Sequence, residues 1–327
     1  MRKSHLLATI LLSAGAGLYQ INASWLASPP TGTPRLVAQR GVAQHYRPAQ
    51  SGSDCLAKLI TPPAHAFIDN TLPSIGAAIT AGADVVEIDI RATADGRFVL
   101  FHDGELSCRT NGSGRLADHA AADLQSLDIG YGYTADGGRT FPLRGTGVGL
   151  MPSLAELLKE YPEQRFLVQI KDGGRGIADA LVAYLDTNQL PAYDRLTFFG
   201  GSAPLSRLKE LVPSAHIWSE HEVRHCLTGY LKTGWIGSVP QACDDGMIIV
   251  PVEQANLLWG WPNRFLARMR DHGTEVMLIG RIDSLSSGQF SRLDTVEQMS
   301  RIPKGFDGLI WTDQIQTVGA ALVRPPT

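Results

Sequence analysis

The chain has 327 residues, of which 44% are hydrophobic and 19% are charged, and its formal net charge is −3. This apolar fraction is enough for a large core, and a single (β/α)8 barrel commonly reaches such a length. The small negative charge, without any run of basic residues, excludes an electrostatic surface for nucleic acid.

The first 27 residues have the layout of a signal peptide or an N-terminal anchor. Arg2 and Lys3 precede an apolar run at 6–18, as in the charged and apolar regions of a secretory signal. The run is short for a membrane span, and Trp25 and Leu26 interrupt the small residues that a cleavage site requires. We expect an exported protein, periplasmic, secreted or membrane-anchored, with removal and retention of 1–27 both open. A Pro-containing spacer follows at 28–35.

Short apolar segments alternate with helix-like segments from residue 36 to 323. The predicted strands are 36–41, 85–90, 98–102, 165–171, 196–200, 216–219, 247–252, 276–280 and 308–312. The predicted helices include 71–83, 153–161, 177–185, 205–211 and 264–272. This alternation is typical of a parallel sheet. The sequence therefore predicts an α/β protein with one domain, a (β/α)8 TIM barrel.

Two segments interrupt the alternation. Residues 43–68 are polar and contain prolines, and residues 130–150 are rich in glycine and carry aromatic side chains. Both are predicted to be loops at the barrel mouth, where substrate contacts usually lie. The glycines of 145–149 follow no strand and open no nearby helix, which indicates a lid or a plain loop rather than a phosphate cradle.

Asp95 and Gly96 separate two β-rich runs, which predicts a hairpin with a two-residue turn. The connection is too short for a helical crossover, so the strands are antiparallel. In this register, residues whose numbers sum to 191 face each other, and Asp89 lies opposite His102. Glu87 points to the same side, two residues away.

Two carboxylates and an imidazole on one face point to a metal site. Like charges this close are costly unless a cation or a proton separates them. Carboxylate oxygens favour a hard ion, Ca²⁺ or Mg²⁺, which would polarise a phosphoryl oxygen while His102 moves a proton. The alternative is a structural, salt-bridged hairpin in which Asp89 only orients a surface histidine.

Two further motifs compete for a function. His221, Glu222 and His225 match the H-E-x-x-H pattern of a zinc peptidase, although no third ligand is apparent and a solvated charged helix is the simpler interpretation. Trp259 and Trp261 follow the strand 247–252. They indicate either an aromatic wall for a lipid-like substrate or packing between strand and helix.

The four cysteines, Cys55, Cys108, Cys226 and Cys243, fit an exported protein with two disulfides. Three pairings are open, and Cys55–Cys108 with Cys226–Cys243 closes the shortest loops.

An ordered series of motifs resembles the glycerophosphodiester phosphodiesterase family. It comprises LVAQRG at 36–41, DNTLP at 69–73, AGADVVEID at 81–89, FHD at 101–103, RTNG at 109–112, MPSLAEL at 151–157, QIK at 169–171 and DGLIWTD at 307–313. The resemblance spans about 35–320 and implies a (β/α)8 barrel that uses a divalent cation and two histidines.

The resemblance assigns roles to individual positions. Glu87 and Asp89 are similar to the metal ligands and His102 to the second catalytic histidine, while Arg40 and Lys171 are similar to the cations that hold the phosphate.

Three positions depart from the family pattern. Gln39 stands in place of the first histidine, Asp69 in place of a glutamate, and Gln169 in place of a carboxylate of the metal shell. Asp69 keeps the charge and is predicted to contact substrate, and Gln169 can still be a metal ligand through its amide oxygen. An amide cannot shuttle a proton, so Gln39 is the most serious departure.

The leading hypothesis is metal-dependent hydrolysis of glycerophosphodiesters, or of related phospholipid headgroup phosphodiesters, to an alcohol and glycerol phosphate. The substrate would be a small phosphodiester or a lysophospholipid-like molecule. Membrane proximity would come from the N-terminal segment, and no protein partner is indicated. The alternative is a phosphodiester-binding pseudoenzyme, and a zinc peptidase is the third hypothesis.

Overall fold

A computed structural model describes His5, Ser13 and residues 15–47, 55–190, 193–284 and 289–322. The chain divides into two compact units. The larger unit is Leu36–Ser219 with Thr312–Thr327, and the smaller is Met1–Arg35 with Glu220–Trp311.

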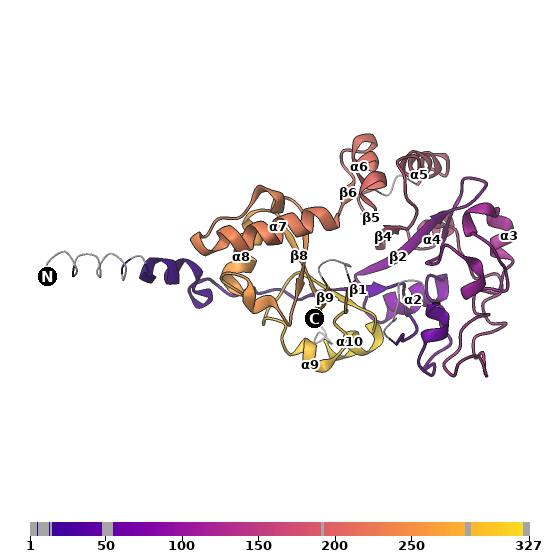
Figure 1. Cartoon of the computed structure of the whole chain (residues 1–327), viewed down its shortest axis with the longest axis horizontal. Coiled ribbons are helices and arrows are strands. Elements are labelled where there is room, and N and C mark those ends of the chain that lie inside the picture. Colours follow the sequence, from indigo (N-terminus) through magenta and orange to yellow (C-terminus); the bar gives the residue numbers. More distant parts are fainter. Residues whose placement is uncertain are drawn as a thin grey trace. The chain divides into compact units, whose positions relative to one another are not determined.

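The larger unit is built on parallel strands in the order β1-β2-β4-β5-β6. These strands are β1 (Arg35–Gln39), β2 (Val85–Ala92), β4 (Arg165–Ile170), β5 (Leu196–Gly200) and β6 (His216–Ile217). The short strand β3 (Phe98–Leu100) pairs antiparallel with β2. The helices of this unit are α2 (Leu72–Thr80), α3 (Ala121–Gln125), α4 (Leu154–Glu160), α5 (Gly176–Thr187), α6 (Ser202–Leu211) and α10 (Ile315–Ala321) (Figure 1).

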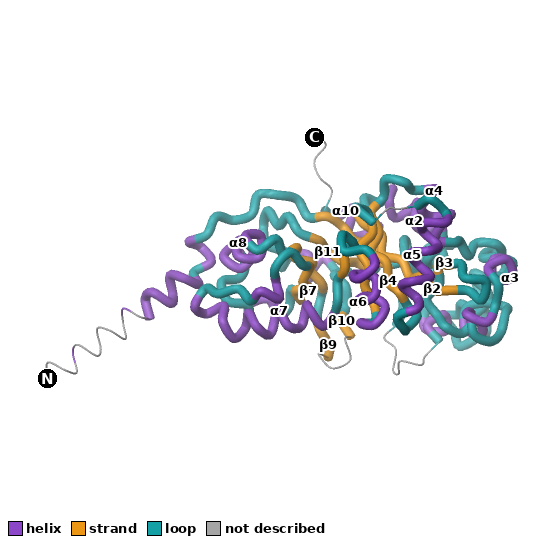
Figure 2. Tube along the Cα trace, turned by 90° about the horizontal axis from the view of Figure 1, so that it is seen from above, coloured by secondary structure: helices purple, strands orange, loops and turns teal. Residues whose placement is uncertain are grey.

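The smaller unit continues the same pattern. Its parallel strands lie in the order β7-β8-β11, with β7 (Met247–Pro251), β8 (Glu275–Ile279) and β11 (Leu309–Thr312). Its helices are α7 (Glu220–Thr233), α8 (Asn263–Asp271) and α9 (Val296–Met299), and β9 (Ile282–Ser284) pairs antiparallel with β10 (Gln289–Phe290). Figure 2 shows this alternation of strands and helices within each unit.

Local sequence explains where the helices begin. Thr71 and Ser153 each accept a hydrogen bond from the third residue of the following helix and complete a capping box, which satisfies backbone donors that the helix leaves unpaired. The predicted strands and helices each overlap an observed element, and the predicted α/β class is confirmed.

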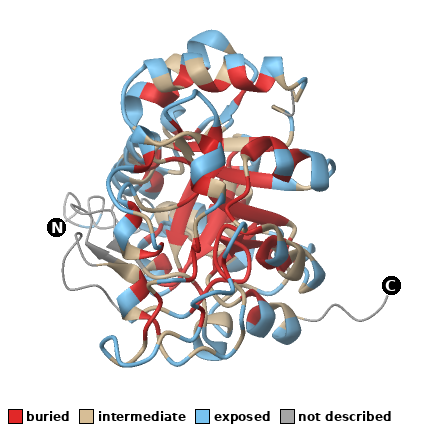
Figure 3. Ribbon diagram, turned by 90° about the vertical axis from the view of Figure 1, so that its right-hand side faces the viewer, coloured by how far each residue is buried: buried red, intermediate tan, exposed pale blue. Residues whose placement is uncertain are grey.

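The strands supply most of the buried core. Six consecutive residues of β2 are buried, and so are all three residues of β3. In Figure 3 the strands at the centre are red, the colour of buried residues. In β2 the polar Glu87 and Asp89 alternate with Ile88 and Ile90, yet the side chains on both faces are buried. The alternation therefore does not mark a solvent-exposed face, and this decides the outcome of the hairpin prediction below.

The two predicted loops pack together on a core cluster of their own. Ile60 comes from 43–68, Tyr133 and Leu143 come from 130–150, and Leu106 and Leu116 lie in the chain between. The Cys55–Cys108 disulfide joins this region, and Cys226–Cys243 links α7 to the turn before β7. Both predicted disulfides are thus confirmed, and the two loops are packed segments.

Within the predicted signal or anchor at 1–27, residues 1–4, 6–12 and 14 lie outside the described residues. Among the residues that are described, no helix combines the length and the apolar character needed to cross a bilayer.

Candidate active site

The hairpin predicted at Asp95 and Gly96 forms, but its register differs by one residue from the prediction. Ile90 pairs with Leu100 and Ala92 with Phe98, so paired residue numbers sum to 190. Thr93 donates its backbone N–H to the carbonyl of Arg97, which encloses three loop residues rather than two. The predicted facing of Asp89 and His102 is therefore wrong.

The error has a physical cause. Alternation of polar and apolar residues sets a register only where one face of a strand meets solvent, and both faces of β2 and β3 are buried. Gly96 has a φ of 71°, the left-handed conformation that closes a three-residue hairpin loop. Phe101 pairs with Asp89 through its backbone N–H, and His102 follows just beyond.

The register of the parallel strands brings the predicted side chains to one end of the sheet. Gln39 of β1 pairs with Glu87 of β2, and Asp89 of β2 pairs with Gln169 of β4. Lys171 follows β4 directly. Because parallel strands end at the same edge, these residues and those that follow them meet at the carboxyl ends of the strands, where barrel active sites lie.

Arg40 occupies the turn after β1 with a φ of 54°. Its Nε lies 2.7 Å from Asp89 Oδ2, and its Nη1 lies 3.8 Å from Asp69 Oδ2. Its backbone N–H donates to both the carbonyl and the side chain of Glu87. Burial lowers the pKa of Arg40, but the carboxylates of Asp89, Glu87 and Asp69 outweigh it and raise the pKa.

Gly41 lets this turn approach helix α2. A Cβ at Gly41 would lie 2.6 Å from Ser74 Oγ, and the φ of 83° is one that other residues rarely adopt. Glycine is therefore required here for Arg40 to reach the carboxylates.

Asp89 is fully buried and surrounded by donors. Asn70 donates to its Oδ2 at 2.9 Å, and Lys171 Nζ lies 3.6 Å from its Oδ1. Burial alone would raise the pKa of Asp89, but Arg40, His102 and Lys171 hold it well below its usual range. Asp89 is consequently ionised at neutral pH.

His102 forms a dyad with Asp103. Its Nδ1 lies 2.5 Å from Asp103 Oδ1, and Arg109 Nε donates to the other oxygen of Asp103 at 2.8 Å. Burial, followed by the positive charge of Arg40, lowers the pKa of His102 to about 4. A neutral imidazole that donates from Nδ1 keeps a lone pair on Nε2, which is the form of a general base.

Arg109 connects the His102–Asp103 dyad to Asp69 by hydrogen bonds. Its Nη1 donates to Asp69 at 3.0 Å and also to the hydroxyl of Tyr133. Tyr46 donates to the same Asp69 oxygen at 2.5 Å. Asp69, predicted to contact substrate, is thus buried in this network.

Five residues of this network had no predicted role: Asn70, Asp103, Arg109, Tyr46 and Tyr133. The first three lie within the motifs that carry the family resemblance, and this position could have marked them as site residues. The tyrosines lie in the two predicted loops, where no periodic pattern marks them.

Lys171 and Gln169 lie beside Asp89 at the ends of the strands. Lys171 Nζ donates to Gln169 Oε1 at 3.2 Å. Burial lowers the pKa of Lys171, with Asp89 opposing this effect and Arg40 adding to it. Gln39 is buried beside Glu87.

The site residues do not fit the predicted divalent cation. Both oxygens of Asp89 lie beside cationic groups, Asp69 is held by Arg109 and Tyr46, and Gln169 contributes no charge. Within the described ranges, no group of three or more His, Cys, Asp or Glu side chains is arranged to hold a metal ion. That Glu87, Asp89 and Gln169 are metal ligands stays a prediction, and the cationic contacts of Asp89 and Asp69 weigh against it.

The competing motifs lie in the smaller unit. His221 and His225 stack on α7 with ring centroids 4.2 Å apart, and both are exposed; the described part of the chain adds no third ligand. Trp259 donates its indole N–H to Leu231 on α7, and Trp261 packs against Phe265 on α8. These contacts match the packing alternative for the tryptophans and a solvated helix for the histidines.

A histidine, buried carboxylates and cationic side chains at the carboxyl ends of parallel strands form the arrangement of an α/β-barrel active site. The sequence model of the Glycerophosphoryl diester phosphodiesterase family matches residues 57–184. This match covers less than half of the chain, and it confirms the resemblance found in the sequence.

Curated relatives agree with this result. A Bacillus subtilis glycerophosphodiester phosphodiesterase is 30% identical over 128 residues, which cover 37% of this chain and 42% of that protein. A rat glycerophosphodiester phosphodiesterase 1 is 42% identical over 64 residues, 20% of this chain and 19% of that protein. The chain thus matches less than half the length of these relatives.

Solved structures confirm the fold over most of the chain. The glycerophosphoryl diester phosphodiesterase domain of an uncharacterized Mycobacterium tuberculosis protein superimposes with a TM-score of 0.62 at 17% identity, covering 88% of this chain and 99% of that one. An Oleispira antarctica phosphodiesterase in complex with the product sn-glycerol-3-phosphate gives 0.51 at 18% identity, covering 89% and 97%. The predicted TIM-barrel fold is therefore confirmed.

Proposed function

We propose that this chain hydrolyses a glycerophosphodiester to an alcohol and glycerol phosphate. The observation that carries the proposal is the His102–Asp103 dyad, which lies in the same charge cluster as Arg40 and Lys171. The family segment at 57–184 contains the dyad, and the Oleispira relative holds a product of this class.

The proposed roles follow from charge and reach. Arg40 and Lys171 bind the anionic phosphate, since guanidinium and ammonium groups are the side chains that recognise its oxygens. His102 accepts the proton of the attacking oxygen at Nε2, and Asp103 fixes the tautomer and stabilises the imidazolium that forms. Arg109 holds Asp103 in place.

The test is an assay of purified protein on glycerophosphocholine, with Ca²⁺, with Mg²⁺ and with a chelator. Release of glycerol phosphate should disappear in His102→Ala and persist in His221→Ala, a matched control whose histidine is exposed on α7. Equal release by the wild type and His102→Ala would refute the assigned role.

Binding without turnover is the second candidate function. It is favoured by Gln39 and Gln169, which provide neither an acid/base group nor a charge at two family positions. Gln39→His tests it: a gain of activity from an inactive wild type would establish that one missing proton carrier separates the binder from an enzyme.

The cation and the location are two expectations from the sequence that are tested separately from the proposed reaction. The sequence predicts Ca²⁺ or Mg²⁺ and an exported chain, and the disulfides fit an oxidising compartment. The chelator arm of the assay tests the first prediction, and cell fractionation tests the second.

A further inference from the structure

The acidic side chains of the site are matched by side-chain cations. Asp89 lies against Arg40 and Lys171, and Asp69 lies against Arg109. Arg40 and the three carboxylates around it, Asp89, Asp69 and Glu87, are almost wholly buried. Like-charged carboxylates need a counterion, and the chain supplies one.

We propose that the guanidinium of Arg40 takes the place of the predicted divalent cation, so that phosphodiester binding needs no metal ion. This inference rests on the proposed function, because it concerns the same phosphate site.

The geometry supports the substitution. A divalent ion requires carboxylate oxygens within about 2.0–2.6 Å, and Asp89 Oδ2 is already engaged by Arg40 Nε at 2.7 Å and by Asn70 at 2.9 Å. A divalent ion at Asp89 Oδ2 would displace the buried guanidinium of Arg40. The guanidinium and the ion, both positively charged, would then lie close together. The shorter Asp69 is held by Arg109 and Tyr46, and the neutral Gln169 attracts cations less than a carboxylate does.

Calorimetry separates this proposal from the question of turnover. Wild-type protein is titrated with Ca²⁺ and Mg²⁺ alone, and then with sn-glycerol 3-phosphate in chelator and in excess cation. We expect no stoichiometric ion binding and the same affinity for sn-glycerol 3-phosphate in both buffers. One bound ion per chain, or an affinity that falls by about tenfold in chelator, would overturn the proposal whether or not the protein is an enzyme.

A variant sharpens the test. Arg40→Met removes the guanidinium while keeping much of the side-chain volume, so the carboxylates should acquire affinity for Ca²⁺, seen as a rise of Tm with added ion. Arg207→Met is the matched control, since Arg207 pairs with exposed Asp179 outside the site. If Arg40→Met does not fold, the wild-type titrations still decide.

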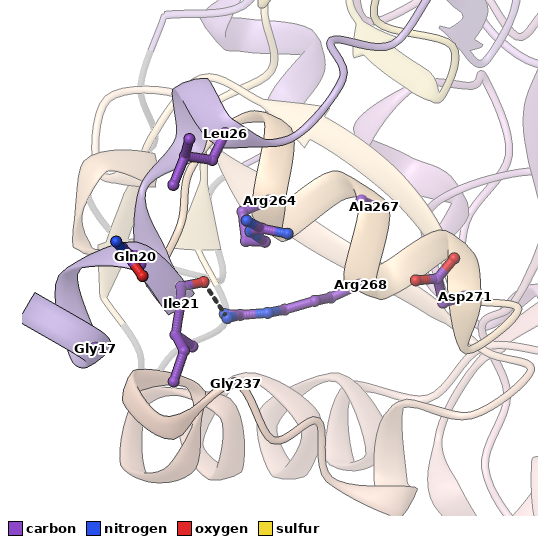
Figure 4. Close-up of a pocket in the computed structure, with 9 residues that line it drawn as sticks. All are labelled: Gly17, Gln20, Ile21, Leu26, Gly237, Arg264, Ala267, Arg268 and Asp271. Carbon is purple, nitrogen blue, oxygen red and sulfur yellow. Dashed lines mark hydrogen bonds between the residues drawn. The ribbon is translucent and has the colours of Figure 1, made fainter.

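An independent observation concerns the N-terminal segment. Figure 4 shows a groove in the smaller unit where Ile21 and Leu26 face Arg264 and Arg268 of α8, with the carbonyl of Ile21 bonded to Arg268. Arg268 is buried, with 9% of its surface exposed.

Several polar contacts attach this segment to the fold. Arg268 donates to the carbonyl of Ile21 at 2.9 Å and to Asn22 Oδ1 at 3.2 Å, and Asn22 donates to the carbonyl of Trp235 at 2.6 Å. Ser24 Oγ accepts the backbone N–H of Asn263, the first residue of α8, at 2.9 Å. Loss of these residues would leave buried donors of Arg268 and a helix terminus without partners, which is costly.

We infer that residues 21–35 are retained in the folded protein, so that any cleavage of the apolar run at 6–18 falls before Ile21. The wild-type chain expressed in an exporting bacterium should have an intact mass whose N-terminus lies before Ile21. A mature N-terminus at Ser24 or later would overturn the inference.

Limited proteolysis gives a second readout. Arg268→Ala should speed cleavage within 21–35, whereas Arg270→Ala, an exposed arginine on the same helix, should not. Equal cleavage rates in wild type and Arg268→Ala would also overturn the inference.

Discussion

Two arginines, Arg40 and Arg268, are buried to the same extent, with 9% exposed, yet their surroundings differ in kind. Arg40 lies among the ionised carboxylates of Asp89, Glu87 and Asp69. Arg268 donates to neutral acceptors, namely backbone carbonyls, Asn22 and the hydroxyl of Tyr230.

The difference indicates that Arg40 belongs to a ligand-binding site, whereas Arg268 has a structural role. A guanidinium that is paired with carboxylates can give up one of these ion pairs and bind a phosphate instead, because carboxylate and phosphate are both anions. A guanidinium bonded to neutral carbonyls satisfies buried acceptors and fixes one chain segment to another. Substitutions in the first region should change ligand binding and rate, and those in the second should change stability.

The largest expected effect is on the rate. His102→Ala should lower kcat/KM by about 10²–10⁴-fold, the usual contribution of a general base, with the Tm changed little because the side chain is partly exposed. Steady-state kinetics on glycerophosphocholine measure it. A loss of activity in Arg268→Ala as large as in His102→Ala would break the distinction between the two regions.

A smaller effect is expected on stability. Arg268→Ala should lower the free energy of unfolding by about 1–3 kcal/mol, because the variant loses the hydrogen bonds of the guanidinium to Ile21, Asn22, Tyr230 and Gly234. Urea denaturation measures the change, and kcat/KM should stay within about twofold of wild type. An unchanged urea midpoint would contradict the structural role of Arg268.

The pH dependence tests the charge cluster. The pKa of His102 is lowered to about 4 in the folded chain, against about 6.5 when unfolded. Between these values only the unfolded state binds the proton, so stability should fall as the pH drops from 6.5 to 4. The contribution should be about 2 kcal/mol after screening of the partly exposed ring, and it should be missing in His102→Gln. An identical pH profile of urea midpoints in both proteins would refute the shift.

The smallest effect concerns the start of α8. Ser24→Ala removes the oxygen that accepts the Asn263 backbone N–H, and should lower the free energy of unfolding by about 0.5–1 kcal/mol, as for a lost helix cap. Ser28→Ala is the control in the same segment. Thermal unfolding of both variants distinguishes them, and equal Tm values would show that Ser24 does not cap this helix.

Local patterns predicted the elements of this chain well. Apolar runs separated by helix-like segments gave the parallel α/β class, because buried parallel strands need consecutive apolar residues. Asp95 and Gly96 predicted a hairpin, and loop length favoured the observed disulfide pairing. The family resemblance assigned Gln39, Glu87, Asp89, Gln169 and Lys171 to one site, and the register of the parallel strands brings them to one end of the sheet.

The details that depend on distant contacts needed the folded chain. The hairpin register was missed by one residue because Thr93 pairs with Arg97 around a three-residue loop instead of a two-residue turn. Both faces of β2 and β3 are buried, so the alternation of polar residues in β2 does not mark a solvent face that could fix the pairing. Arg109 joins Asp103 to Asp69 across 40 residues of sequence, and Arg268 reaches Asn22 across 246. Hydrogen bonds and ion pairs of this kind depend on which side chains meet in the folded chain. The residues next to them in the sequence do not indicate these partners.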